Sequence, residues 1–548
     1  MSSDTKKQPN DLWIRLRDLL RYTLLGIAVA LTCTVLFVSA TQAFELDELT
    51  VADLQEGMQS GKYTARSITE MYLARIKEID QNGPALKSVL EVNPDALAVA
   101  DQLDKERREG HIRGPLHGIP VLVKDNIDTA DKMNTTAGSY ALVGVPVYQD
   151  AFIVQKLREA GAIILGKTNM SEWAYFRSTR GSSGWSARGG QTLNPYILTR
   201  NPCGSSSGSG AAIAANLAAV AVGTETDGSI VCPSSANSLV GIKPTLGLVS
   251  RSGIIPIAHS QDTAGPMART VADAAVLLGA LTGVDPQDAE TNKSRGKAIA
   301  DYRKFLDPDG LRGARIGVAR NFFGYHEKID QLIQQSIEVM RRQGAIIVDP
   351  ANIETAGKFG GSEFEVLLYE FKADMNKYLA TRGPNGPKSM KDLIEFNEKN
   401  RDLEMPYFEQ EVFLMAEKKG PLTDEAYLKA LHKNHQLART EGIDATLKKY
   451  NLDAIVAPTG GPICVTDLVI GDHLIPAFGS PQWSPSAPAV AGYPHITLPA
   501  GYISGIPVGI SFIGGAFGEP MLVKIAYSFE QATKFRKPPR FQPSDEAR

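Results

Sequence analysis

The sequence predicts an α/β fold in which a largely buried β-sheet is covered by helices. Short apolar segments recur along the 548 residues and alternate with segments of helical periodicity, which is the pattern of a covered sheet. Hydrophobic residues make up 43% of the chain and glycines number 50, as expected of a turn-rich globular enzyme. The predicted strands are 119–124, 162–166, 314–319, 453–457 and 509–513.

The first helices are predicted between residues 51 and 79. Apolar spacing indicates one helix on each side of 61–64, where Gly61 interrupts the pattern and Thr64 is placed to cap the second helix. A charged helix is expected from Asn93 to near Gly110. The strand 119–124 then ends at Lys124, and apolar neighbours on a central strand would lower the pKa of its ammonium group.

The rest of the chain continues this alternation. A helix is expected over 151–160, before the strand 162–166. The segment 210–222 is almost entirely Ala, Ile, Leu and Val, which predicts a buried helix that is apolar nearly all round. Residues 356–450 are more charged and more helical in pattern, which predicts a peripheral helical cap. No Pro/Gly/Ser-rich or charged linker divides the chain, so we expect residues 44–548 to form a single domain, either as one large unit or as two halves that share a core.

Residues 1–43 have the order of an export signal. Five basic residues from Lys6 to Arg21 precede the uncharged run 22–44, which includes Ala40-Thr-Gln-Ala43. Basic, then apolar, then small residues favour a secretory signal cleaved after Ala43. The run is also just long enough to span a bilayer, so the alternative is an uncleaved membrane anchor, the only membrane contact expected. Either interpretation exports residues 44–548 to the periplasm or the medium.

Charge and cysteine content exclude several kinds of partner and structure. The 58 basic and 61 acidic residues nearly balance, so a small molecule or peptide is expected as partner and nucleic acid is not. Cys203, Cys232 and Cys464 lie outside the apolar run and are too few for a disulfide framework. We interpret Cys203 and Cys232 as small apolar residues that line a tight site, rather than as redox groups.

Ser205 and Ser229, 24 positions apart, are the candidate catalytic residues. Each lies in a glycine-rich turn, 204–210 or 223–229, and such turns can present backbone N–H groups to an oxyanion. The predicted helix after Gly210 would add its positive dipole end. A serine hydroxyl needs a base, and no histidine lies near either serine in sequence. A neutral lysine can replace histidine, which directs attention to Lys124.

Other interpretations of the turns fit less well. Residues 204–208 match the Gly-x-Ser-x-Gly elbow centred on Ser206, with His259 or His495 as partner, but 194–202 would be a poor preceding strand. A flexible linker would not lead directly into a buried helix. A phosphate-binding loop needs a Gly-Lys-Ser/Thr ending that this turn lacks. The eight histidines show no metal-binding spacing, so neither a metal nor another cofactor is expected.

Four ordered motifs resemble those of the amidase signature family. They are 114–126 around Lys124, the serine turn 204–210, Gly223-Thr-Glu-Thr-Asp-Gly-Ser229, and 262–269. The resemblance extends from about Leu46 to Lys534 and implies a large mixed, twisted central β-sheet covered on both faces by helices. Within the family, Cys203, the Thr226-Asp-Gly-Ser229 variant and 248–256 are most similar to bacterial peptide amidases.

The resemblance also implies the roles of the site residues. Lys124 would be the base, Ser205 the bridging serine after a cis peptide bond from Gly204, and Ser229 the nucleophile of a Ser-Ser-Lys triad. Backbone N–H groups from Thr226 to Ser229 would hold the oxyanion. The predicted oxyanion- or substrate-binding residues are Thr226, Asp227, Gly228 and Ser206, and Ser206 is also expected to brace its turn.

Asp227 departs from the pattern of the family. Many members have Gly-Gly-Ser at the nucleophile, whereas this chain has Asp227-Gly-Ser229. A carboxylate aimed at the oxyanion would oppose its formation, so we expect the side chain to face away from it. Asp227 then either contacts the substrate or bonds its own backbone as a turn residue.

These observations predict an exported serine amidohydrolase that cleaves primary amides to carboxylate and ammonia through an acyl-enzyme. The favoured substrate is the C-terminal amide of peptides, and the alternative is a broad-specificity aliphatic, aryl or fatty amide hydrolase with the same triad. The glutaminase subunit of a tRNA-dependent amidotransferase shares the triad, but export would separate it from tRNA. An inactive binding protein would lack a triad member, and this chain retains all three.

Overall fold

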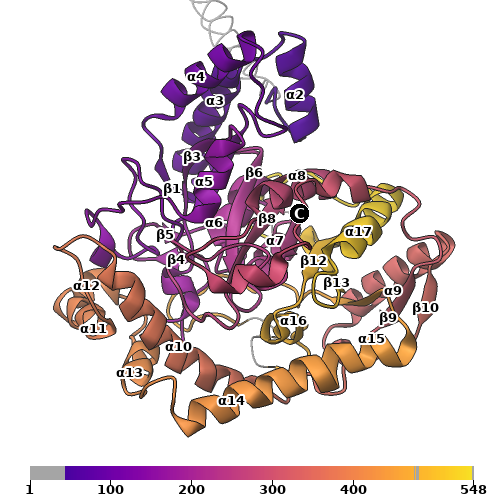
Figure 1. The fold of residues 1–548 in the computed structure, drawn as a ribbon. Helices are drawn as coiled ribbons and strands as arrows, with labels where there is room; N and C mark the ends of the chain where they lie inside the picture. The colour runs from indigo at the N-terminus through magenta and orange to yellow at the C-terminus, as the bar shows by residue number, and fades with distance from the viewer. Residues whose placement is uncertain (1–43, 474–475, 477–479, 546–548) are drawn as a thin grey trace, which may run out of the picture. The chain divides into compact units, whose positions relative to one another are not determined.

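A mixed β-sheet forms the centre of the fold (Figure 1). The computed structural model describes residues 44–473, 476 and 480–545. The chain divides into two units, Met1–Asp47 and Glu48–Arg548. Within the described residues, eleven strands run in the order β1-β3-β2-β6-β8-β7-β12-β13-β11-β9-β10. Their bounds are β1 Val89–Val92, β2 Pro120–Lys124, β3 Ile163–Thr168, β6 Val220–Glu225, β7 Val240–Lys243, β8 Thr263–Ala268, β9 Arg315–Val318, β10 Ile346–Val348, β11 Ala454–Pro458, β12 His495–Ile503 and β13 Ile506–Ile513; β4 Trp185–Ser186 and β5 Gly190–Gln191 form a separate pair.

The sheet is mixed because parallel and antiparallel pairs alternate in groups across it. Strand β2 is parallel to both β3 and β6, and β9 is parallel to both β10 and β11. The strands between these groups pair antiparallel, from β6 through β8, β7, β12 and β13 to β11. All five strands predicted from the sequence are present, with ends shifted by a few residues. The mixed sheet implied by the family resemblance is confirmed.

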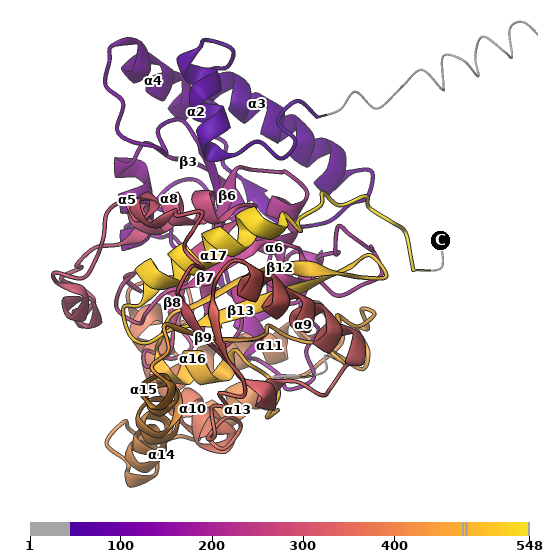
Figure 2. The ribbon, with the colours of Figure 1, turned by 90° about the vertical axis from the view of Figure 1, so that its right-hand side faces the viewer.

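Most of the helices that contact the sheet belong to two groups. Helices α6 and α7 pack on each other and on strands β2, β6, β7 and β12, whereas α8, α9 and α17 form a second connected group that packs on β8, β11, β12 and β13 (Figure 2). Thr64 caps α3 by accepting a hydrogen bond from the Ser67 N–H, as predicted. The helix bounds are α2 Val51–Gln59, α3 Ala65–Arg75, α4 Ala96–Arg108, α5 Phe152–Glu159, α6 Ser207–Ala214, α7 Val231–Ala236, α8 Val271–Leu281, α9 Glu327–Arg342, α10 Gly360–Ala380, α11 Met390–Lys399, α12 Arg401–Glu404, α13 Glu411–Glu417, α14 Glu425–His435, α15 Asp444–Tyr450, α16 Ser486–Ala491 and α17 Glu519–Thr533.

Helices α10 to α15 lie within the segment 356–450, whose pattern predicted helices. Part of this segment packs on the turn that follows β3. Phe371 of α10 and Phe413 of α13 are fully buried, and Phe413 meets Trp173 edge-on with 5.7 Å between the ring centroids. These contacts belong to one apolar cluster, so α10 and α13 share a core with residues 170–176.

The prediction of one buried helix over 210–222 was wrong in its second half. Helix α6 ends at Ala214, and Asn216 takes a left-handed backbone conformation with φ +58°, which is typical of a helix end. The chain then enters β6, where Val220 and Val222 pair with β2 on one side and with β8 on the other. A segment buried all round shows no periodicity that separates a helix from a central strand, which explains the error.

The predicted export segment lies in residues 1–43, outside the described residues. Within the residues that the structure does describe, no helix is both long and apolar enough to cross a membrane.

Candidate active site

Lys124 is fully buried at the end of β2 and contacts two hydroxyl groups. Its Nζ donates to Ser205 Oγ at 2.8 Å and to Thr224 Oγ1 at 2.9 Å, and it also contacts the Thr224 carbonyl oxygen at 3.2 Å. Burial lowers the pKa of Lys124 to about 7, against the opposing effect of the Glu225 and Asp262 carboxylates. Near neutral pH, a large fraction of Lys124 is therefore uncharged and able to accept a proton.

Ser205 faces Lys124 from the serine-rich turn before α6. It is 1% exposed, and the peptide bond from Gly204 to Ser205 is cis, as the family resemblance implied. The Ser205 carbonyl accepts a hydrogen bond from the Ser171 N–H at 3.1 Å. The turn thus holds Ser205 by its backbone and leaves its hydroxyl to Lys124.

Ser206 links this turn to the turn that carries Ser229. Its N–H donates to the Ser229 carbonyl at 3.2 Å. Its Oγ donates to the Thr224 carbonyl at 3.1 Å and accepts from the Thr224 N–H at 3.2 Å. The expected bracing role is therefore present, whereas the predicted contact of Ser206 with substrate stays a prediction.

The turn of Ser229 offers free backbone donors. Within the described residues, the N–H groups of Asp227, Gly228 and Ser229 donate no hydrogen bond, whereas those of Ile230 and Val231 both donate to Glu225 Oε2, at 2.7 and 3.1 Å. Glu225 therefore fixes the chain immediately after Ser229 and leaves the preceding N–H groups to bind a ligand. Ser229 itself is 9% exposed.

Gly228 and Thr226 are placed by contacts on either side of this turn. Gly228 has φ +78°, and a Cβ there would lie 2.7 Å from Cζ2 of Trp483, so both the backbone and the space require glycine. The Thr226 hydroxyl donates to Asp262 Oδ1 at 2.6 Å. Asp262 also accepts the N–H groups of Ile257 and Ala258 at 2.8 Å, which makes it a structural residue of the neighbouring loop.

Asp227 makes long-range contacts that neither sequence interpretation included. Its Oδ1 accepts the indole N–H of Trp483 at 3.0 Å, and its Oδ2 accepts the hydroxyl of Ser486. Burial raises the pKa of the Asp227 carboxyl, and these two hydrogen bonds partly offset the effect. Asp227 therefore ties the segment 483–486 to the turn of Ser229, rather than bonding its own backbone. Sequence reasoning missed Trp483 because about 250 residues separate it from Asp227.

Cys203 and Cys232 form a disulfide, which corrects the interpretation of both as small apolar residues. Their Cα atoms are 6.0 Å apart, and 29 positions separate them in sequence. The remaining described cysteine, Cys464, is free and partly exposed. The count of cysteines was too low to suggest a framework, but each of the paired cysteines stands within three residues of a candidate catalytic serine.

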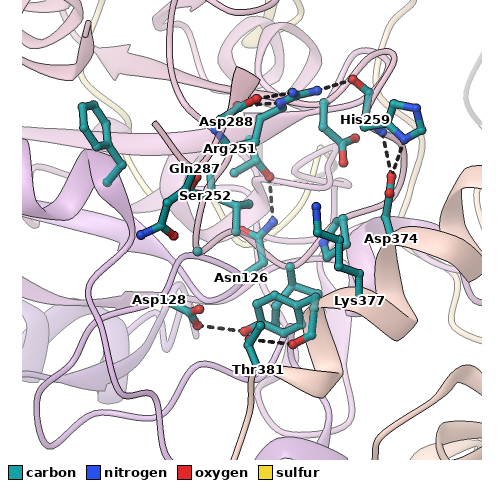
Figure 3. Close-up of a pocket in the computed structure, with 18 of the residues that line it drawn as sticks. Asn126, Asp128, Arg251, Ser252, His259, Gln287, Asp288, Asp374, Lys377 and Thr381 are labelled. Atoms are coloured by element: carbon teal, nitrogen blue, oxygen red, sulfur yellow. Dashed lines mark hydrogen bonds and ion pairs between the residues drawn. The ribbon is translucent and has the colours of Figure 1, made fainter. Parts of the chain in front are cut away.

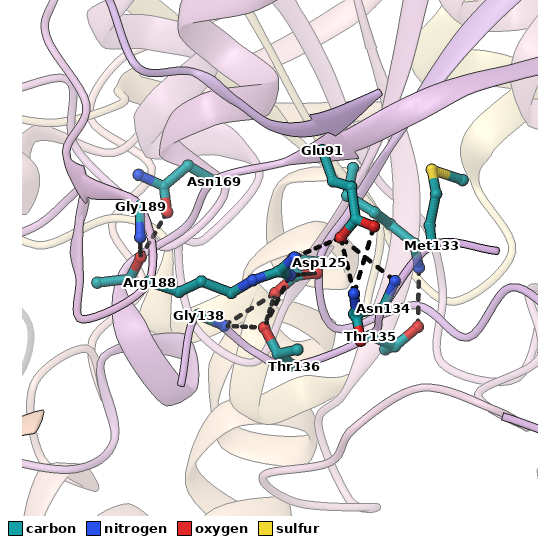
Figure 4. A network of polar contacts seen from close by, with 12 residues as sticks. Glu91, Asp125, Met133, Asn134, Thr135, Thr136, Gly138, Asn169, Arg188 and Gly189 are labelled. Atoms are coloured by element: carbon teal, nitrogen blue, oxygen red, sulfur yellow. Dashed lines mark hydrogen bonds and ion pairs between the residues drawn. The ribbon is translucent and has the colours of Figure 1, made fainter. Parts of the chain in front are cut away.

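The loop after Lys124 is held by a polar network (Figure 4). Asp125 is buried, and its Oδ2 accepts the Gly138 N–H at 3.0 Å and the hydroxyl of Thr136. Arg188 forms an ion pair with Asp125 at 3.6 Å and a second one with Glu91. Asp125 thus anchors residues 136–138 beside the end of β2, while the next residue, Asn126, donates to Thr224 Oγ1 at 3.0 Å.

Thr224, whose hydroxyl contacts Lys124, also lines a cavity of about 810 Å³. Asn126 (Figure 3) and Thr226 line the same cavity, while Lys124, Ser205 and Ser229 are not among the described residues that line it. His259 and Asp374 stand at the cavity and, with Glu370, bring three potential metal ligands within 4.8 Å of one another. The ring nitrogens of His259 already contact both carboxylates, at 2.8 Å for Asp374 and 3.4 Å for Glu370.

The histidines that the elbow interpretation required have other partners. His495 is buried with Nε2 2.6 Å from Ser511 Oγ, and His259 pairs with Asp374. Ser206 instead uses its hydroxyl on the Thr224 backbone. The contacts therefore favour Lys124 over either histidine as the base beside these serines.

Comparison with known proteins shows similarity to amidases in both sequence and structure. Residues 67–523 match the amidase family. The chain belongs to the amidase signature family. The solved structure of the peptide amidase PAM in complex with the competitive inhibitor chymostatin is similar to this chain, with a TM-score of 0.87 and 50% identity over 90% of this chain and 99% of that one. The native peptide amidase of Stenotrophomonas maltophilia has a TM-score of 0.85 at 49% identity, covering 91% and 99%.

A probable amidase of Arabidopsis thaliana is 43% identical over 512 residues, which is 91% of this chain and 93% of the relative. These similarities confirm the predicted family and fold, and they make the protein an amidase of the serine hydrolase class.

Proposed function

We propose that this amidase hydrolyses the C-terminal amide of peptides, with Ser229 as nucleophile, Ser205 as proton relay and Lys124 as base. The observation that carries the mechanism is the 2.8 Å contact between Lys124 Nζ and Ser205 Oγ, in a site where burial brings the pKa of Lys124 to about 7. A lysine in this state accepts a proton near neutral pH without help from a histidine.

The reaction begins with two proton transfers. Neutral Lys124 takes the proton of Ser205, and Ser205 takes that of Ser229, whose Oγ attacks the amide carbon. The carbonyl oxygen becomes an oxyanion beside the free N–H groups of Asp227, Gly228 and Ser229. The bond from carbon to nitrogen breaks as Ser205 gives its proton to the leaving nitrogen, which departs as ammonia, and Lys124 returns a proton to Ser205. Water then attacks the acyl-enzyme and releases the carboxylic acid.

The choice of a peptide amide rests on the two peptide amidase structures that are about 50% identical over 90% of this chain. The contact between Asp227 and Trp483 adds a local feature, because Trp483 covers Gly228 on the turn of the nucleophile. An aromatic ring beside the turn of the proposed nucleophile suits a peptide backbone and side chain more than a small free amide.

Export to an oxidising compartment is the second part of this proposal. The order of basic, apolar and small residues in 1–43 supports it. The Cys203–Cys232 disulfide adds independent support, because disulfides persist outside the reducing cytosol. Fractionation of cells that express the full chain should place the amidase activity in the periplasm, the medium or the membrane fraction. Activity confined to the cytosol would contradict this location.

The nucleophile is tested by Ser229→Ala in the full chain. This variant should fold normally and lose amidase activity by about a thousandfold or more, because the acyl-enzyme cannot form. Ser234→Ala is the matched control: Ser234 lies one turn further along, and its buried hydroxyl has no hydrogen-bond partner among the described residues. Activity of Ser229→Ala close to that of Ser234→Ala would refute the assignment.

The substrate class is tested by comparing kcat/KM for a peptide amide, the same peptide as free acid, and small aliphatic and aryl amides. Ammonia release from the peptide amide should be fastest, with no cleavage of internal peptide bonds. If small free amides are hydrolysed and the peptide amide is not, the broad-specificity alternative replaces the peptide amidase proposal.

A further inference from the structure

We propose that the Cys203–Cys232 disulfide is a positioning element of the active site. It holds the turn of Ser205 against the turn of Ser229 and thereby sets the rate of acylation. The inference rests on the proposed roles of Lys124, Ser205 and Ser229, and goes beyond them by assigning a kinetic function to two residues that take no part in the chemistry.

The disulfide joins the two turns close to both hydroxyl groups. Cys203 immediately precedes Gly204 and the cis bond to Ser205. Cys232 follows Ser229 by three residues, and its N–H donates to the Gly228 carbonyl at 2.8 Å, so it is bonded to the turn of the nucleophile. With 6.0 Å between the two Cα atoms, the covalent link spans the gap between the segments that carry the relay and the nucleophile.

The backbone conformation of Cys203 indicates that a cysteine side chain is required at this position. Cys203 has φ +56°, in the left-handed region where a residue with a Cβ is disfavoured and glycine or asparagine is more usual. Its N–H donates to Asn201 Oδ1 at 2.7 Å, which stabilises this conformation. Both half-cystines are nearly inaccessible, 2% exposed for Cys203 and 7% for Cys232, so the disulfide belongs to the interior of the site.

Other links from the turn of Ser205 to the segment that carries Ser229 are hydrogen bonds. Ser206 makes three of them, from its N–H to the Ser229 carbonyl at 3.2 Å and through its Oγ to the carbonyl and the N–H of Thr224 at 3.1 and 3.2 Å. Before Cys203, Asn237 Nδ2 donates to the Pro202 carbonyl at 3.0 Å. The disulfide is thus the covalent restraint nearest to Ser205 in the described residues. Because a relay loses rate when its groups move by less than an ångström, loss of this restraint should affect turnover more than binding or folding.

The proposal is tested with two variants of one position. Cys203→Ser keeps the size of the side chain, and Cys203→Gly removes the disulfide while suiting the left-handed backbone. Cys464→Ser is the control, because it removes a cysteine that is free. The measurements are kcat and KM for amide hydrolysis, the rate at which a fluorophosphonate labels the active serine, and the melting temperature, all on the full chain.

We expect kcat and the labelling rate to fall by about tenfold or more in both Cys203 variants, while KM changes by less than about twofold. These effects should persist at temperatures far below melting, where each variant is fully folded. The acid limb of kcat/KM should also move to higher pH, because a looser site admits water and raises the pKa of Lys124. Cys464→Ser should match the wild type in every measurement.

Full kcat in a folded Cys203 variant would overturn the proposal. A loss of kcat that disappears at temperatures below the melting temperature of the variant would overturn it as well. If neither variant folds, wild-type protein is treated with tris(carboxyethyl)phosphine and its thiols are counted by mass spectrometry. Two new thiols together with full activity would likewise overturn it. Failure of the proposed function would look different, since the wild type would then lack amidase activity or Ser229→Ala would retain it.

Discussion

Replacement of Lys124 by methionine should stabilise the protein while it abolishes activity. Burial lowers the pKa of Lys124 from 10.5 to about 7. At about 1.36 kcal/mol per pKa unit, this difference corresponds to a folding cost on the order of 4–5 kcal/mol at pH 7 and below. Methionine removes that cost but leaves Ser205 and Thr224 without the Lys124 donor, a loss of roughly 1 kcal/mol each. A net gain of about 2–3 kcal/mol in the free energy of unfolding is expected.

The pH dependence of this gain in the free energy of unfolding shows whether the gain comes from removal of the lysine charge or from better packing of methionine. The folded pKa of Lys124 lies below the unfolded value, so between about 7 and 10.5 the unfolded state binds more protons. Wild-type stability should therefore rise with pH across this window, and Lys124→Met should lack that rise. By the same arithmetic, the advantage of Lys124→Met should shrink by roughly 3 kcal/mol between pH 7 and pH 9.5. Urea unfolding at both pH values measures it, and an advantage that stays constant, or is absent at pH 7, would refute the reasoning.

The activity of the wild type should report the same group. If neutral Lys124 is the base, kcat/KM falls at low pH with an apparent pKa near 7. At pH 5 about one hundredth of Lys124 is neutral, so kcat/KM should be about a hundredfold below its plateau. Initial rates of ammonia release between pH 5 and pH 9 provide the test. A plateau that extends down to pH 5 would exclude Lys124 as the base.

Three other variants test separate parts of the structure. Ser205→Ala should lower kcat by about a hundredfold or more without loss of fold, because it removes the hydroxyl that contacts Lys124; steady-state kinetics and circular dichroism measure this, and unchanged kcat would contradict the relay. Asp227→Asn should raise KM several-fold and alter tryptophan fluorescence, because the amide can keep only part of the contacts to Trp483 and Ser486; unchanged KM would mean that this link does not shape the acyl site. Arg177→Leu should destabilise the protein by about 3–5 kcal/mol in denaturant unfolding, because it leaves Glu172 buried without its partner at 2.5 Å, and a loss below about 1 kcal/mol would count against this estimate.

Local patterns predicted those parts of the fold that depend on neighbouring residues. Apolar segments in the sequence identified β2, which ends at Lys124, and its parallel neighbour β3. Both strands were recognisable because burial on a central strand requires a continuous apolar run. Thr64 was recognisable as a helix cap because its hydrogen bond reaches only three residues. The same local reasoning failed at 215–222, where burial on all sides hides the difference between α6 and β6.

The contact between Lys124 and Ser205 in the candidate site was predictable from the motifs, whereas the contacts of Trp483 and the disulfide were not. Lys124 and Ser205 are 81 positions apart in sequence, and they were assigned to one site from the motif resemblance and not from their spacing. Trp483 had no such motif, so its bond to Asp227 appeared only in three dimensions. The number of cysteines did not predict the disulfide between Cys203 and Cys232, because a cysteine count detects only small folds that many disulfides hold together. A single disulfide inside a large core has a different role from a disulfide framework. The position of Cys203 and Cys232 beside the two candidate catalytic serines indicates that role.

The topology explains why residues from three segments meet. Strands β2 and β6 are adjacent and parallel, so their carboxyl ends lie at the same edge of the sheet, and Lys124 at the end of β2 reaches Thr224 near the end of β6. Between Ser205 and Ser229 the chain runs through α6 and then β6, which returns it to the same edge, where Ser206 bonds the Ser229 carbonyl. The spacing of 24 residues is therefore the length of one helix, one strand and the turns around them. A shift of β6 against β2 would separate Lys124 from Thr224, so the register of two buried strands sets the position of Lys124, the proposed base.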